Sequence, residues 1–79
     1  MITLPILPSP VRLMFEGLNL SIRIARTQSA AELAAERAYG FVLGIETVNA
    51  VTSDTVDRLY AWVNATYAEA IDELQYDGQ

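Results

Sequence analysis

The 79-residue sequence contains no cysteine, no histidine and no lysine. Without cysteine the chain has no disulfide and no thiolate chemistry, and without histidine it also lacks the usual protein ligands for zinc. Histidine is the side chain most often used as a general base near neutral pH, so its absence argues against acid–base catalysis. A domain this small usually needs a disulfide, a metal or a partner chain for stability, and only the last remains.

Long apolar runs are also missing. The longest stretch without a charge is Met1–Val11, which contains three prolines, whereas a membrane-spanning helix needs about 20 apolar residues. No basic residue precedes this stretch, so it does not resemble a signal peptide. We therefore expect no membrane association and a cytoplasmic location.

Basic charge is scarce. Five arginines face ten acidic residues, which gives a formal net charge of −5, and residues 41–79 carry Arg58 as their one basic residue. An acidic chain is repelled by phosphate backbones, so we do not expect nucleic acid as a partner. The acidic half favours contact with a basic surface, although a solvated helix end explains the same pattern.

What the sequence does contain is apolar residues, 52% of the chain, which recur at helical spacing in three segments. This pattern predicts an all-α fold, a small helical bundle built on a long helical hairpin with an extended apolar N-terminal arm. We expect one domain over residues 1–79. Its parts are an arm at 1–9, rich in proline, and helices at 10–26, 29–48 and 53–75.

Each expected helix has a start signal. Ser9 followed by Pro10 is typical of a capping residue and a first helical turn. Ser29 and Glu32 have the spacing of a capping box, in which each side chain bonds the backbone of the other. Ser53 can cap the third helix. Asp54 then lies at the positive end of this helix, where an acidic side chain is favourable.

The first helix carries apolar residues on two sides. The expected core face consists of Val11, Phe15, Leu18, Ile22 and Ala25, with Met14 beside them. Leu13, Leu20 and Ile24 form a second stripe almost opposite, and a polar band that includes Asn19 lies between the two. Because one hairpin cannot cover both stripes, we predict self-association, with a homodimer favoured, through Leu13, Leu20 and Ile24.

The second helix contains two glycines one turn apart, Gly40 and Gly44, on the face of Leu33. Glycine costs about 1 kcal/mol of helix propensity relative to alanine. We expect this cost to be offset by a close approach of another helix.

An alternative remains open for Leu18–Ile24, which alternates strictly between apolar and polar residues, as a half-buried strand does. With a strand here the chain resembles the ribbon–helix–helix repressors. Asn19, Ser21 and Arg23 would then occupy the outward positions that contact the major groove in that family. The resemblance implies a dimeric DNA-binding repressor, whereas the Ser9-Pro10 start signal favours a helix.

Chemical motifs are absent. The sequence has no glycine-rich phosphate loop and no nucleophile motif. Glu32 and Glu36 are spaced by one helical turn, as are Glu69 and Glu73, but such pairs are typical of solvated helix faces. We therefore predict that the protein is not an enzyme and binds no metal or cofactor.

Trp62 is the residue that most suggests a function. It projects opposite the apolar stripe of the third helix, together with Arg58, Glu69 and Asp72. Tryptophan is enriched at the centres of protein interfaces, and Arg58 can stack on it from one turn away. We predict a partner-binding surface at these four residues. The alternative is that the first helix or the arm covers Trp62 within the same chain.

The segment Ser29–Leu74, a capped alanine-rich helix followed by a short turn and a second helix, resembles the small helical-hairpin accessory proteins of bacteriophages. The resemblance rests on this pattern and covers somewhat over half of the chain. It implies a protein that binds and blocks a host protein, as anti-CRISPR proteins and antagonists of host regulators do.

Overall fold

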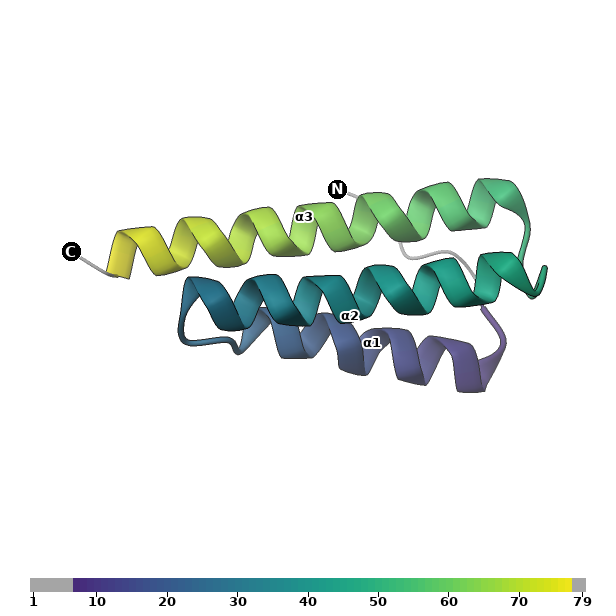
Figure 1. Ribbon diagram of the computed structural model, residues 1–79, viewed down its shortest axis with the longest axis horizontal. Coiled ribbons are helices and arrows are strands. Elements are labelled where there is room, and N and C mark those ends of the chain that lie inside the picture. Colours follow the sequence, from purple (N-terminus) through teal and green to yellow (C-terminus); the bar gives the residue numbers. More distant parts are fainter. Residues whose placement is uncertain (1–6, 78–79) are drawn as a thin grey trace.

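The computed structural model describes residues 7–77, which form three packed helices (Figure 1). They are α1 (Ser9–Arg23), α2 (Gln28–Thr47) and α3 (Ser53–Asp77), and no strand occurs among the described residues. The predicted all-α bundle is therefore confirmed. None of the three helices combines the length and hydropathy needed to cross a membrane. Of the predicted arm, residues 1–6 lie outside the described part of the chain, and Leu7 is buried in the core.

The segment that alternates like a strand belongs to α1 as far as Arg23. Its apolar residues also fit helical spacing, and Ile22 is completely buried on the same side as Phe15. Asn19 is buried, and the Ser21 hydroxyl donates to the Gly17 carbonyl at 3.1 Å. Residues 18–23 therefore do not form the strand that a ribbon–helix–helix repressor would require at this position.

The start of α1 lies one residue before the predicted position. Pro8 is the capping residue, and its carbonyl accepts the first helical hydrogen bond from the Arg12 amide at 2.9 Å. Proline has no side-chain acceptor, so α1 begins without a side-chain cap, and the predicted capping by Ser9 is wrong.

The other two helices are capped by threonines rather than by the predicted serines. The Thr27 hydroxyl accepts from the Ala30 amide at 3.1 Å, and the Thr52 hydroxyl accepts from the Thr55 amide at 3.2 Å. Ser29 lies inside the first turn of α2, so the predicted capping box does not form. Threonine supplies the same acceptor geometry as serine, and the spacing of the apolar residues alone does not distinguish the two starts.

The helix ends follow from these caps. Thr27 is extended where it caps α2, so α1 cannot continue through it; α1 ends at Arg23, three residues before the predicted end. The end of α2 is a Schellman motif, in which the Asn49 amide donates to the Glu46 carbonyl and the Ala50 amide donates to the Ile45 carbonyl. Asn49 has a φ of 55°, a left-handed conformation that asparagine tolerates better than most residues.

In the core, α1 and α3 contribute mainly large buried side chains, whereas most of the fully buried residues of α2 are small. The largest fully buried side chains of the core are Phe15, Ile22, Val42, Leu59 and Val63. The buried side of α2 otherwise consists of alanine, at positions 31, 34, 35 and 38. Small residues let neighbouring helices approach closely, so α2 serves as the surface against which the other two pack.

Two residues of α1 differ from their predicted environment. Met14, expected beside the core, is 56% exposed. Asn19, expected in the polar band, is 4% exposed, and its amide nitrogen donates to the Phe15 carbonyl at 3.0 Å. The Asn19 side-chain oxygen has no hydrogen-bond partner among the described residues. The core therefore contains a polar group whose hydrogen bonding is half satisfied.

Replacing Asn19 with leucine, which keeps the branch at Cγ, should stabilise the fold. The substitution removes an unpaired buried oxygen, whose desolvation costs about 1–3 kcal/mol. We expect a higher melting temperature in thermal unfolding followed by circular dichroism. A lower melting temperature would show instead that the packing and hydrogen bond of the Asn19 amide stabilise the fold by more than the desolvation of its unpaired oxygen destabilises it.

The two glycines of α2 do not mediate close packing within the chain. A Cβ atom added to Gly40 or Gly44 would meet no atom within 4 Å. The expected approach of another helix of the same chain is therefore wrong. These glycines lie on the exposed side of α2, opposite its alanines.

Gly40→Ala and Gly44→Ala should each stabilise the protein by about 0.5–1 kcal/mol, because the methyl group is accommodated and helix propensity improves. Chemical denaturation of the two variants measures this gain, with Ala30→Gly on the same helix as the reverse control. If neither variant has a higher free energy of unfolding than the wild type, the open space around Gly40 and Gly44 is contradicted.

Candidate protein-binding groove

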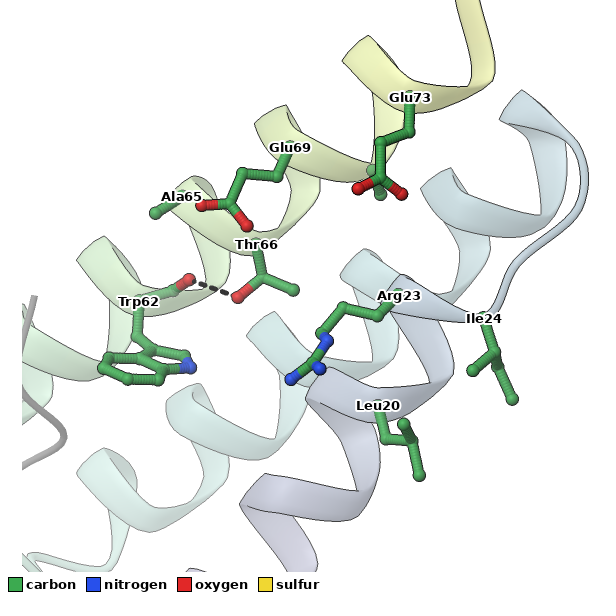
Figure 2. Close-up of a pocket in the computed structure, with 9 residues that line it drawn as sticks. Leu20, Arg23, Ile24, Trp62, Ala65, Thr66, Glu69 and Glu73 are labelled. Carbon is green, nitrogen blue, oxygen red and sulfur yellow. Dashed lines mark hydrogen bonds between the residues drawn. The ribbon is translucent and has the colours of Figure 1, made fainter. Parts of the chain in front are cut away.

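A groove of about 550 Å³ lies between α1 and α3 on the side of Trp62 (Figure 2). We call it the α1/α3 groove. Its lining residues are Leu20, Arg23, Ile24, Trp62, Ala65, Thr66, Glu69, Ala70 and Glu73. A second hollow of about 340 Å³ shares Arg23, Ala70 and Glu73 and adds Ala25, Arg26 and Leu74. The second hollow thus adjoins the groove on the side of Arg23 and Glu73.

One stripe of α3 forms most of the groove. Trp62, Thr66, Glu69 and Glu73 follow one another at spacings of four, three and four, so they share one side of the helix. Ala70 is small and lies beside this stripe, which leaves the floor of the groove hollow. The last turns of α1 supply the opposite wall.

Trp62 is half-buried, and it packs against the core while its ring also lines the groove. In Figure 2 the indole nitrogen points toward the space between Trp62 and Arg23. The Thr66 hydroxyl donates to the Trp62 carbonyl at 2.9 Å, so this hydroxyl is already bonded within the helix. Trp62 thus offers an apolar ring and a polar edge to an occupant of the groove.

Opposite charges face each other across the groove. Figure 2 shows the Arg23 side chain extending from α1 with its guanidinium toward Trp62, and the Glu69 and Glu73 side chains extending from the α3 wall. Among the described side chains, none of these three belongs to an ion pair. Their donors and acceptors are therefore available to a bound molecule.

The remaining predicted residues lie elsewhere. The Arg58 Nε atom is 3.2 Å from Asp54 Oδ2, one turn toward the start of α3, so the arginine is directed away from the predicted stacking on Trp62. Asp72 is exposed and is not among the groove residues. Of the four predicted partner-binding residues, the groove contains Trp62 and Glu69.

The predicted self-association stripe of α1 is exposed. Leu13 is 64% exposed, Leu20 is 51% exposed and Ile24 is 66% exposed. Leu20 and Ile24 also form the rim of the groove, which the sequence pattern of α1 alone did not indicate.

Sequence reasoning missed Arg23, Thr66 and Glu73 as groove residues. For the two residues of α3 a signal was present, since both continue the spacing that begins at Trp62. The sequence pattern predicts Arg23 in the polar band of the first helix or, in the repressor alternative, at a DNA-contacting position of a strand. Its place opposite Glu69 depends on how α1 packs against α3.

A different contact joins α2 to α3 on another side of α3. The Tyr39 and Tyr60 rings lie 6.1 Å apart at an angle of 35°. The Tyr39 hydroxyl donates to the Asn64 side-chain oxygen, and the Tyr60 hydroxyl donates to Glu46 Oε1 at 3.5 Å. Tyrosine therefore supplies both apolar contact and hydrogen bonds across this seam.

Two tyrosines at the contact of α2 with α3 have raised pKa values. Removal from water raises the pKa of Tyr60 above its ordinary value, and the negative charge and hydrogen bond of Glu46 raise it further. Removal from water likewise raises the pKa of Tyr67, with Glu32 adding to the effect. In both cases the folded state favours the neutral phenol.

Stability should fall as the pH rises above about 10, because the unfolded chain then ionises its tyrosines before the folded chain does. Below that pH both states are neutral at these positions and this contribution is fully present. The chain has no lysine or cysteine to titrate in the same range. Urea denaturation between pH 8 and pH 11 measures the effect. Tyr60→Phe with Tyr67→Phe should flatten the profile, and an unchanged profile would contradict this assignment.

Among residues 7–77, no group of three or more acidic side chains is placed to hold a metal ion. No family model matches the chain, and no curated protein or solved structure matches it significantly.

Proposed function

We propose that the protein is a non-enzymatic protein–protein interaction module that binds a helix of a larger protein in the α1/α3 groove and blocks that protein by occlusion. The observation that supports this most directly is Trp62, a half-buried aromatic ring in a groove whose charged side chains are unpaired. Aromatic anchors of this kind contribute a large share of the energy at many interfaces.

The length of the groove suits a helix as its occupant. From Trp62 to Glu73 its α3 wall covers three helical turns, a length of about 16 Å at 1.5 Å per residue. Leu20 and Ile24 supply an apolar rim on the other side. A helix that places apolar residues on Trp62 and between these walls makes the helix-in-groove contact seen in many recognition modules.

The charges define the partner further. Glu69 and Glu73 line the α3 wall, and the whole chain has a net charge of −5. We expect basic residues on the flank of the occupant that faces α3 and an acceptor opposite Arg23. Such complementarity speeds association and fixes the orientation of the bound helix more than it increases affinity.

The target that we propose is a bacterial host protein. The resemblance of the α2–α3 hairpin to bacteriophage accessory proteins supports a target of this kind, which the protein would bind in the bacterial cytoplasm. Blocking it requires no chemistry, because a bound module excludes other ligands from the covered surface.

The test is a pull-down with the tagged full chain from nuclease-treated bacterial lysate, followed by binding measurements between the two purified proteins. We expect one stoichiometric protein to be captured. Trp62→Ala should weaken its affinity by at least about 2 kcal/mol, as for interface hot spots. Recovery of the bait alone would contradict the proposal for the host tested.

Because Trp62 also contacts the core, a second variant separates binding from folding. Glu69→Arg changes an exposed groove residue and should weaken binding without loss of helicity. Asp57→Arg makes a comparable change of charge at an exposed position of α3 outside the groove. Equal effects of these two variants would show that net charge, rather than the groove, controls binding.

A further inference from the structure

The two helices that line the α1/α3 groove run in the same direction. Short connections at residues 24–27 and 48–52 reverse the chain twice, so α2 is antiparallel to both neighbours and α1 is parallel to α3 (Figure 1). The C-terminal ends of α1 and α3 therefore point toward the same end of the groove. Each such helix end carries partial negative charge, equivalent to about half an elementary charge.

The side chains at this end of the groove add more negative charge. Glu69 and Glu73 line the groove there, and Asp72 lies beside them on the exposed surface of α3. Arg26 lines the adjoining hollow, and the last turn of α3 contains no basic residue. Even with Arg26 counted, the three carboxylates exceed the one guanidinium at this end.

The other end of the groove has the opposite character. Trp62 lies there, and the guanidinium of Arg23 is directed toward it (Figure 2). The next charged residues toward the starts of the two helices, Glu16 and Arg58, do not line the groove. The groove is therefore negative near Glu73 and positive near Trp62.

This polarity favours one direction of a bound helix. A helix antiparallel to α1 and α3 places its positive N-terminal end beside Glu69 and Glu73, and its negative C-terminal end toward the Arg23 guanidinium. A parallel helix places its negative end beside the two carboxylates and beside the negative ends of α1 and α3. The antiparallel direction also completes an up-down-up-down arrangement of four helices, the common form of such bundles.

We propose that the occupant of the α1/α3 groove is an amphipathic helix antiparallel to α1 and α3, with basic residues in its first two turns and an apolar residue against Trp62. This inference rests on the proposed function, to which it adds the direction and the sequence pattern of the bound helix. Trp62 precedes Glu69 by seven residues and Glu73 by eleven, a distance of about 10–16 Å along the helix. The apolar residue of the occupant therefore follows its basic residues by two to three turns.

The test uses two synthetic peptides of about 18 residues, a length at which an isolated helix can form. Both lack tryptophan, have blocked ends and share one composition and one face of leucine and alanine. One carries two arginines in its first two turns, and the other carries them in its last two turns. Trp62 is the one tryptophan of the protein, so its fluorescence in the full chain reports binding in the groove.

The peptide with arginines in its first two turns should bind about tenfold more tightly at low salt. Arginines near an N-terminus oppose the helix dipole, so this peptide is the poorer helix when free, and the preference cannot come from helicity. Equal affinities, tighter binding of the other peptide, or no change in fluorescence with either one would overturn the proposal.

Matched variants of the protein locate the source of the preference. The double variant Glu69→Gln with Glu73→Gln should lose most of the preference, because the carboxylates that favour the basic end are gone. Asp57→Asn removes an exposed carboxylate of α3 outside the groove and should keep it. A preference unchanged in the double variant would overturn the role given to the two glutamates.

A nitroxide label on the first residue of the tighter-binding peptide measures the direction itself. It should broaden the amide NMR signals of Glu69 and Glu73 more than that of Trp62. The reverse pattern would overturn the antiparallel direction and leave the proposed function standing. A pull-down that recovers the bait alone, while the peptides still differ, would contradict the proposed function and not the direction.

Discussion

The close packing of α1 and α3 on α2 is the contact on which the rest of the molecule depends. The buried side of α2 consists largely of alanine, so the large side chains must come from the other two helices, chiefly Phe15, Ile22 and Leu59. In a chain of 79 residues this arrangement fills a small core without a disulfide. It also leaves α1 and α3 to meet along an edge that no third helix covers, and the α1/α3 groove lies along that edge.

The number and type of the helices could be predicted from the sequence because apolar spacing repeats over each segment. Details that depend on neighbours could not. Asn19 is polar, yet it lies on the side of α1 that the bundle buries. The serines near each helix start are as good caps as the threonines that act in α2 and α3, and only the course of the loops decides between them. The spacing of Gly40 and Gly44 suggested a close approach that the described chain does not contain.

The candidate site was predicted in part for the same reason. Trp62 and Glu69 follow from the pattern of α3 alone, because they lie on one side of that helix. Arg23 belongs to another helix, and its position opposite them depends on packing that no single-helix pattern contains. Arg58 was expected beside Trp62 because the two are one turn apart. Asp54 lies one turn from Arg58 in the opposite direction, and Arg58 pairs with this carboxylate instead.

The two apolar sides of α1 have a consequence for motion. This helix is the shortest of the three, and only its buried side packs against α2 and α3. Short elements with few buried contacts open locally at a lower cost than the whole domain unfolds, and their amides exchange with solvent accordingly. Any molecule that docks on the exposed side of α1 binds the closed form in preference to the open one, so its binding free energy adds to the cost of opening. The hydrogen-exchange protection of α1 is thus a measure of how much of the protein is in a complex.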